Sequence, residues 1–273
     1  EALPTKPEPP PELPEVAPKI QAEDPVLLKR APPVRWVYGS HHKTGTVMLR
    51  HLAYDQANLT NMEYCFHMGY QGWYPNQCQV NRIRHARVWF HCDLAAMWLA
   101  QAGEKGMPLR IVHIIRDPIA MVVSGYIYHQ DNEDTPDKLK VERTMSMADA
   151  LAFEARWVLQ TSGLMMVSSY LHAPREETLH VRLESFMRSS ESFDATSRRI
   201  FNFTVGDTLS KTKLNKLVKM ASRHDLRRHP NYVGPPGHVA EEHDTGRIRE
   251  AVRHLPSGLL NELRAMRKTL GYE

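Results

Sequence analysis

Apolar positions repeat with two different periods after residue 33, and this pattern predicts the elements of the fold. Residues 110–115 are almost all hydrophobic, which is typical of a central parallel strand covered on both faces. Residues 46–58 instead place Met48, Leu49 and Leu52 on one side of a helix. Because such strands and helices alternate along the chain, we expect an α/β fold with a central parallel β-sheet and helices on both faces.

The same pattern predicts the remaining elements. Strands are expected at residues 34–38, 87–91 and 178–183. Helices are expected through Leu94, Met97, Trp98 and Ala102, from Asp117, and over residues 147–171. The C-terminal part is otherwise mostly helical, with a break at the Pro- and Gly-rich residues 230–237. No internal repeat is present. These elements suffice for one domain.

The first 33 residues differ in composition from the rest of the chain. Six prolines fall within residues 4–14. Proline has a fixed φ and no amide donor, so this stretch cannot form a helix or a sheet ladder. We therefore expect residues 1–33 to be an extended, proline-rich stem or linker, and residues 34–273 to form the folded domain.

Composition narrows the function classes only slightly. The 273 residues carry 35 Lys and Arg against 31 Asp and Glu, a formal charge of +4. This mild balance predicts no nucleic-acid partner, but it permits a local basic pocket for an anionic ligand. No apolar run approaches the roughly 20 residues that span a bilayer. Collagenous, coiled-coil and wholly disordered classes are excluded.

Three cysteines are too few for a disulfide scaffold, and none forms a CxxC pair of the kind that binds structural zinc. Cys65 and Cys78 could close a loop in an oxidising compartment and leave Cys92 as a buried thiol. Three reduced thiols are an equally good interpretation. The sequence leaves this choice open.

Residues 40–46 lie between the first predicted strand and its helix, and they have the composition of an anion site. In parallel α/β sheets this end of the strand faces the ligand crevice. Backbone amides of the turn would converge there with Lys43 and with the hydroxyls of Thr44 and Thr46. Gly45 would let the backbone approach the ligand closely.

The order of these residues separates two kinds of phosphate loop. In the nucleotide triphosphatase loop Lys follows the glycine, whereas here Lys43 precedes Gly45 by two positions. The order Lys-Thr-Gly-Thr after a strand resembles the 5′-phosphosulfate loop of sulfotransferases that use 3′-phosphoadenosine 5′-phosphosulfate (PAPS) as donor. An ordinary strand-to-helix turn could carry the same four residues by chance.

A second motif strengthens the resemblance. Residues 114–118, Ile-Ile-Arg-Asp-Pro, are followed by Ser124, eight positions after Arg116, and together they look like the 3′-phosphate motif of the same family. Asp117 can cap the helix and Pro118 suits its first turn, so Arg116 should lie at the end of the strand. A guanidinium at that point suits a terminal phosphate.

The resemblance implies the P-loop NTPase-like sulfotransferase fold, PAPS as co-substrate and no metal ion. It places the nucleotide on Lys43, Thr44, Gly45, Thr46, Val47, Arg116 and Ser124, with Gly237 and His238 as remnants of a C-terminal loop and Arg227 and Arg228 as nearby basic contacts. The sequence departs from the family where His42 replaces proline and where Val47 and Met48 replace a hydroxyl residue and Trp.

The resemblance also implies catalytic roles. Lys43 would neutralise the leaving bridging oxygen, since positioning and electrostatics dominate group transfers of this kind. His91, at the end of a predicted strand, would be the general base, because family members carry a catalytic His at a similar place. Glu63 is the alternative base. Asp93 is expected to be only the cap of the next helix.

The function expected from these motifs is sulfuryl transfer to a hydroxyl or amine acceptor, with a carbohydrate as the expected acceptor. The stem, the possible disulfide and two sequons at Asn58 and Asn202 predict a Golgi-lumenal, single-pass type II enzyme whose anchor precedes Glu1. A cytoplasmic enzyme is the alternative location. A P-loop kinase and a degenerate sulfotransferase-like binding module are the alternative functions.

Overall fold

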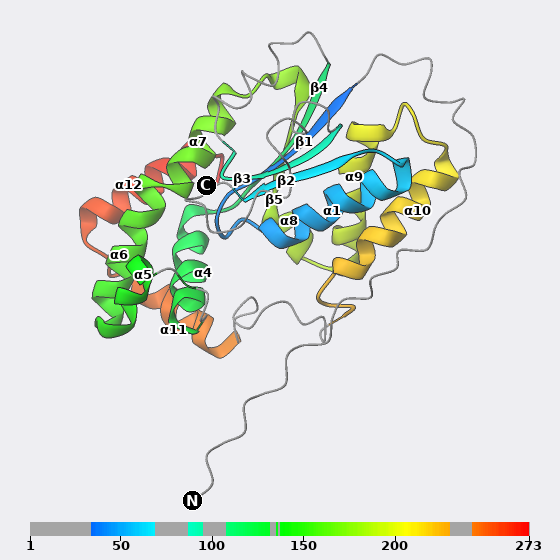
Figure 1. The fold of residues 1–273 in the computed structure, drawn as a ribbon. Coiled ribbons are helices and arrows are strands. Elements are labelled where there is room, and N and C mark those ends of the chain that lie inside the picture. Colours follow the sequence, from blue (N-terminus) through cyan, green and yellow to red (C-terminus); the bar gives the residue numbers. More distant parts are fainter. Residues whose placement is uncertain are drawn as a thin grey trace, which may run out of the picture. The chain divides into compact units, whose positions relative to one another are not determined.

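Five parallel strands form one sheet in the computed structural model, which describes residues 34–68, 87–94, 108–131, 135, 137–229 and 242–272 (Figure 1). The strands are β1 (Arg35–Ser40), β2 (Tyr64–Met68), β3 (Val88–Cys92), β4 (Leu109–Ile115) and β5 (Thr178–Arg182). Their order across the sheet is β2-β3-β1-β4-β5, and every pair is parallel. The predicted α/β fold is confirmed. The stem predicted at residues 1–33 lies outside the described residues.

Helices connect the strands and follow them. They are α1 (Thr46–Thr60), α4 (Pro118–Asp131), α5 (Asp137–Lys140), α6 (Met147–Gln160), α7 (Ser162–His172), α8 (Leu183–Met187), α9 (Ser190–Val205), α10 (Lys211–Ala221), α11 (Glu242–Val252) and α12 (Ser257–Thr269). Short 3₁₀ turns occur at η2 (Val141–Thr144), η3 (Arg175–Glu177) and η4 (Ser222–His224).

The two faces of the sheet bury different cores, because successive strand residues point to opposite sides. On one face, Tyr38 and Phe90 pack with side chains of α1, α9 and α10. On the other, Ile115 packs with α4, α6, α7, α11 and α12 (Figure 1). A smaller cluster around Val37 and Ile111 fills the centre of this second face.

The structure differs from the predicted elements at two places. The helix expected over residues 147–171 is broken into α6 and α7 at Thr161, whose hydroxyl donates to the carbonyl of Trp157 at 2.5 Å. A hydroxyl that bonds the preceding turn competes with the helix ladder. The edge strand β2 (Tyr64–Met68) was not predicted. The helix expected through Leu94, Met97, Trp98 and Ala102 lies, except for Leu94, outside the described residues.

The strand register places four histidines in one row across the sheet. His67 pairs with His91, His113 pairs with His180, and Gly39 lies between the two pairs in β1. A Cβ on Gly39 would lie 2.2 Å from Leu94 Cδ2, so this position requires glycine. The row therefore lies on the face covered by α7, just below the loop that follows β1.

The cysteines differ in state. Cys65 is disulfide-bonded, whereas Cys92 is a buried free thiol whose pKa is raised by burial. One of the two interpretations of the sequence made Cys92 a buried thiol and Cys65 part of a disulfide, and the structure agrees with it. Cys78 lies outside the described residues.

Candidate nucleotide-binding site

The loop between β1 and α1 presents backbone amides at the carboxyl edge of the sheet. Gly45 is the N-cap of α1 in the left-handed region, with φ of 90°, and no side chain caps this helix. A Cβ on Gly45 would also meet Leu183 Cδ1 at 2.7 Å, so glycine is required for space as well as for conformation. Amides in the first turn of a helix lack intrahelical partners, and such amides bind anions.

Thr44 does not offer its hydroxyl to a ligand, which corrects the sequence prediction. Its buried Oγ1 accepts the amide hydrogen of His41 at 2.8 Å and donates to the carbonyl of His41 at 2.8 Å. The Thr44 amide also donates to this carbonyl at 3.0 Å. The hydroxyl of Thr46 donates to it at 2.9 Å. Both threonines therefore brace the turn, and the donors that remain for an anion come from the start of α1.

Arg116 joins the two sequence motifs. It follows β4, the neighbour of β1, and its guanidinium donates to the backbone carbonyl of Lys43 at 2.7 Å. The side chain is partly buried, and burial together with the charge of Arg249 lowers its pKa while the carboxylates of Glu184 and Asp117 raise it. The predicted 3′-phosphate motif thus contacts the predicted 5′-phosphosulfate loop directly.

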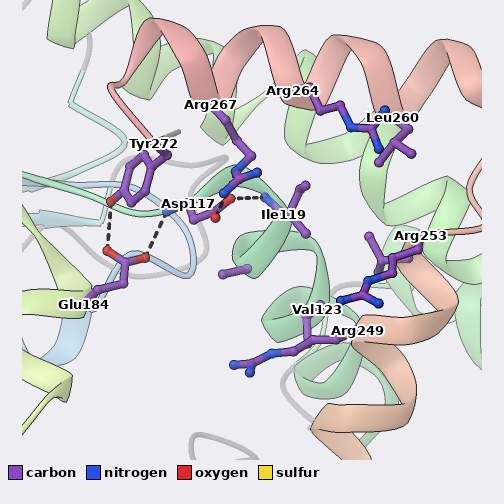
Figure 2. A pocket seen from close by; sticks show the side chains of 12 residues that line it. Asp117, Ile119, Val123, Glu184, Arg249, Arg253, Leu260, Arg264, Arg267 and Tyr272 are labelled. Atoms are coloured by element: carbon purple, nitrogen blue, oxygen red, sulfur yellow. Dashed lines mark hydrogen bonds and ion pairs between the residues drawn. The ribbon is translucent and has the colours of Figure 1, made fainter.

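The start of α4, just after Arg116, is held by several hydrogen bonds. Asp117 Oδ1 accepts the amide hydrogen of Ile119 at 2.9 Å, which confirms the predicted cap. Glu184 accepts from the Asp117 amide at 3.1 Å and from the hydroxyl of Tyr272 at 2.8 Å (Figure 2). Ser124 lies two turns further along α4 and is partly exposed.

A pocket of 490 Å³ lies beside this helix start, between α4, α11 and α12 (Figure 2). Arg249, Arg253, Arg264 and Arg267 line it. Arg267 forms an ion pair with Asp117 at 3.0 Å. The pocket is therefore predominantly basic and adjoins Arg116.

The side chain of Lys43 lies against an aromatic ring. Its Nζ is 3.2 Å from the centre of the Tyr128 ring in α4, a cation–π contact. Burial lowers the pKa of Lys43 well below its ordinary value, the carboxylate of Glu154 raises it, and Arg116 lowers it. Lys43 itself has a positive φ of 64°. The loop thus turns this ammonium toward α4.

His41 leads into a set of histidines buried in the sheet. Its Nε2 lies 2.8 Å from Nε2 of His113, and Nδ1 of His113 lies 3.0 Å from Nδ1 of His180. His41 and His113 are fully buried. Burial lowers the pKa of His41 to about 3 and that of His180 to about 4, so these rings are neutral at physiological pH. We call His41, His113 and His180 the neutral branch.

His42 leads instead to buried carboxyl groups. Its Nε2 lies 3.2 Å from Nε2 of His129, and Nδ1 of His129 lies 2.9 Å from Glu154 Oε2 and 3.5 Å from Glu142 Oε1. His129, Glu142 and Glu154 are all fully buried. We call His42, His129, Glu142 and Glu154 the acidic branch.

The two carboxyl groups of the acidic branch interact strongly. Burial raises the pKa of Glu142 and of Glu154 to about 7. Within these values, Glu154 contributes to the rise at Glu142, and Glu142 lowers the pKa of Glu154. Both carboxyl groups therefore hold a proton to higher pH than an ordinary glutamate does.

Sequence reasoning missed both glutamates of the acidic branch. A signal was present at Glu154, because it falls on the apolar face of α6 among Leu151, Ala155 and Val158. A charged residue in such a stripe needs a buried partner. In the described part of the chain, His129, Glu142 and Glu154 also form a cluster of residue types that can bind a metal ion. Their ligand atoms lie within 4.8 Å of one another.

Solved structures resemble this fold, whereas no family model and no curated protein matches the sequence. Mouse sulfotransferase SULT7A1 complexed with PAP aligns with a TM-score of 0.53 at 12% identity, covering 88% of this chain and 85% of that one. Retinol dehydratase in complex with androsterone and inactive cofactor PAP aligns with a TM-score of 0.50 at 14% identity, covering 86% and 81%. The chain has a sulfotransferase fold.

Within this sulfotransferase fold, the two candidate bases lie away from the loop or deep in the sheet. His91 belongs to β3, is 2% exposed, and has its ring 4.5 Å from that of His67. Burial lowers the pKa of His91 to about 3, which makes it a weak proton acceptor. Glu63 is exposed before β2, at the amino edge of the sheet, whereas the loop lies at the carboxyl edge. The structure therefore does not bring Glu63 to the site.

Asp93, expected only to cap a helix, contacts the loop. It follows β3 with a positive φ of 57°, and its Oδ1 accepts the amide hydrogen of His42 at 3.2 Å. Burial raises the pKa of Asp93 to about 6, and the hydrogen bond from His42 lowers it. Asp93 thus fixes the backbone just before Lys43.

The C-terminal residues predicted to contact the nucleotide are either committed elsewhere or outside the described residues. Arg228 binds Asp194 with two hydrogen bonds of 2.7 and 2.8 Å, and Arg227 donates to the carbonyl of Met187. Gly237 and His238 lie outside the described residues.

Among the helices that the structure describes, none is long and apolar enough to span a membrane.

Proposed function

We propose that this chain transfers the sulfuryl group of PAPS to a hydroxyl or amine acceptor. The observation that carries the proposal is the contact between Arg116 and the carbonyl of Lys43. It brings a guanidinium, an ammonium and an uncapped helix start to the same edge of the sheet. The likeness to sulfotransferase structures supports this reading at the level of the fold.

The donor set fits a nucleotide with two phosphate groups. The first-turn amides of α1 suit the 5′-phosphosulfate, since a helix N-terminus favours negative charge. Arg116 is already fixed by the Lys43 carbonyl, and its remaining donors suit the 3′-phosphate. Ser124 follows on α4 as the second 3′-phosphate contact.

Lys43 is the residue proposed to assist the leaving group. Transfer forms a bond from the acceptor oxygen to sulfur and breaks the bond from sulfur to the bridging phosphate oxygen, whose negative charge then needs a partner. The ammonium of Lys43 follows a flexible stem and can move from the Tyr128 ring to that oxygen. An anion in the site would also raise the lowered pKa of Lys43.

We further propose a carbohydrate acceptor and a lumenal location. The disulfide at Cys65 supports an oxidising compartment. Asn58 and Asn202, the acceptor positions of the two sequons, are both exposed at the surface. A type II anchor would precede the proline-rich residues 1–33. Thiol labelling tests this location, because it measures the oxidation state of the cysteines in protein secreted through the endoplasmic reticulum.

Calorimetric titration separates this function from its alternatives. PAP (3′,5′-adenosine bisphosphate) should bind without Mg²⁺, and ATP with Mg²⁺ should bind much more weakly. Transfer is then assayed with ³⁵S-labelled PAPS and a panel of lactose, chondroitin, heparosan, 4-nitrophenol and 4-nitrobenzyl alcohol. Binding of ATP in preference to PAP would contradict the proposal, and PAP binding without transfer to any acceptor would favour a binding module.

A further inference from the structure

The acidic branch runs from the protein interior to the loop that holds Lys43. Its inner end, Glu154, is fully buried, and its outer end, His42, is partly exposed. The carboxyl group of Glu154 lies where a Cβ on Gly125 would be, 1.9 Å from Oε1, so α4 carries glycine at the point of contact. The helix is thus shaped to admit this carboxylate beside His129.

The rings of His42 and His129 meet edge to edge. Their planes differ by only 5°, their centres are 5.3 Å apart, and their Nε2 atoms are 3.2 Å apart. Parallel rings whose nitrogens are so much closer than their centres lie nearly in one plane. The contact between His42 and His129 is therefore an in-line N–H···N hydrogen bond.

The carboxylate fixes which nitrogen carries each proton. When Glu154 is ionised it accepts from Nδ1 of His129, so the lone pair of a neutral His129 is on Nε2. That nitrogen must accept, and Nε2 of His42 must donate. The lone pair of His42 is then on Nδ1. This is the arrangement by which a buried carboxylate orients a catalytic histidine in other enzymes, extended here by one further imidazole.

We propose that His42 is the general base of the reaction and that His129 and Glu154 are its positioning residues. This inference rests on the proposed sulfuryl transfer. The acceptor hydroxyl gives its proton to Nδ1 of His42 as its oxygen bonds to sulfur, and the bridging oxygen leaves with the electron pair of the broken bond. The imidazolium later releases the proton to water, so that sulfate ester, PAP and one proton are formed.

Position and charge support this role. His42 directly precedes Lys43, and both side chains contact Tyr128, His42 with ring centres 6.0 Å apart. A positive charge formed on His42 is stabilised through His129 by Glu154, which lies in a medium of low polarity. His91, by contrast, has its ring against His67 and Trp89 inside the sheet.

Groups from every neighbouring element set the titration of this branch. Glu142 favours protonation of His129 through its hydrogen bond and its charge, whereas burial, Lys43 and Arg143 oppose it. Arg143 also donates to the His129 carbonyl at 2.9 Å. The remaining neighbours are Glu154, which lies 2.9 Å from Nδ1 of His129, Asp93, which accepts from the His42 amide, Tyr128, and His41, which is neutral.

The first test needs no substrate. Two-bond ¹H–¹⁵N NMR of the labelled full chain reports the tautomer of each histidine, and the variants His42→Asn and His129→Gln assign the signals. We expect His129 protonated on Nδ1 and His42 protonated on Nε2. Glu154→Gln should disturb the tautomer of His129. A His42 ring protonated on Nδ1 would overturn the proposal.

The second test compares two acceptors of similar shape. 4-Nitrobenzyl alcohol must lose its proton during transfer, whereas 4-nitrophenol is already largely ionised at slightly alkaline pH. We expect His42→Asn to lower kcat about 100-fold or more with the alcohol and less than about tenfold with the phenol. An equal loss for both, or no loss, would contradict a base at His42.

Controls separate failure of the base from failure of the function. His172 is exposed on α7, so His172→Asn should change neither rate nor tautomers. His42→Asn should keep its PAP affinity, while its Tm falls because the buried His129 loses its hydrogen bond to His42. Glu154→Gln should lower kcat with the alcohol and shift the midpoint of its pH profile to lower pH, because the carboxylate no longer favours the imidazolium. If the wild-type chain binds no PAP, the proposed function fails. The tautomers of His42 and His129 still test the hydrogen-bond chain from His42 to Glu154.

Discussion

His41 and His42 are neighbours in the chain, yet their side chains meet opposite surroundings. Each contacts a second histidine through Nε2 atoms, at 2.8 Å for His41 and 3.2 Å for His42. Beyond that contact the neutral branch continues to His180, whereas the acidic branch ends on Glu154. His41 itself has a carboxyl group nearby, since Asp93 Oδ1 lies 3.9 Å from its Nδ1. The closer carboxyl groups at the end of the acidic branch, and not the histidine contacts, make the difference.

The comparison shows how burial among histidines differs from burial in direct contact with carboxyl groups. The pKa of His113 is lowered well below its ordinary value by burial and then by its two histidine neighbours. The pKa of His129 is also lowered by burial, but Glu142 opposes the shift through its hydrogen bond and its charge. The neutral branch can brace the loop, while only the acidic branch can stabilise a proton near Lys43.

The largest effect is expected at Lys43, toward which the acidic branch points. Lys43→Ala should lower kcat about 100- to 1000-fold, because it removes a preorganised charge at the leaving oxygen. The fold should persist, since the residue lies on a loop. Transfer of ³⁵S and thermal unfolding measure the two effects. Lys268→Ala, an exposed lysine of α12, is the control, and a Lys43→Ala variant with more than about a tenth of wild-type kcat/KM would contradict the role.

Glu142→Gln tests the electrostatics of the acidic branch. Burial raises the pKa of Glu142 from 4.5 to about 7, so its contribution to stability is fully present below pH 4.5 and is lost as pH rises through about 7. Glutamine does not titrate. The variant should therefore gain about 3 kcal/mol relative to wild type between pH 4 and pH 8.

Urea unfolding at a series of pH values measures this difference. Glu176→Gln, at an exposed carboxylate of η3, should show no such trend. A constant difference between Glu142→Gln and wild type across the range would mean that Glu142 is not a buried, protonated acid.

Gly125→Ala tests the packing that admits Glu154. The added methyl group would meet Glu154 Oε1, so we expect a loss of about 1–3 kcal/mol in the free energy of unfolding. Gly258→Ala in α12 is the matched control, because nothing lies within 4 Å of its Cβ position. That variant should gain about 0.4–1 kcal/mol. Equal responses in chemical denaturation would show that no close contact exists at Gly125.

The variants His113→Gln and His129→Gln compare the second histidine of each branch. Each removes one imidazole contact, and each should lower stability by about 1–3 kcal/mol, since a buried partner loses its hydrogen bond. Only His129→Gln should change the pH dependence of kcat. Rate profiles measured for both variants decide this. A changed profile in His113→Gln would place the neutral branch in the proton path and erase the distinction.

Much of the fold follows from the sequence, because its strong signals are local. The apolar run of β4, the helical spacing of α1 and the Asp-Pro start of α4 each predict their element within a few residues. The short edge strand β2 and the break at Thr161 carry weak signals. Their formation depends on pairing with β3 and on a single hydroxyl contact.

The candidate site was only partly predictable. The order of Lys43 and Gly45 and the position of Arg116 indicate an anion site, since these signals lie in consecutive residues. The inward hydroxyl of Thr44 and the acidic branch depend on tertiary contacts, and residues 129 and 154 meet only after α4 and α6 have packed. Spacing along the chain therefore could not reveal the acidic branch.

The central claim is that the two motifs hold one nucleotide, and Arg116→Ala tests it most directly. Calorimetry compares PAP with adenosine 5′-monophosphate, which lacks the 3′-phosphate. The variant should weaken PAP binding by about 1.5–3 kcal/mol and leave the monophosphate nearly unchanged, since a hydrogen bond to a charged partner is worth that much. Ser124→Ala should show the same selectivity with a smaller loss. Equal weakening of both ligands would mean that Arg116 only braces the Lys43 loop, and the claim would fail.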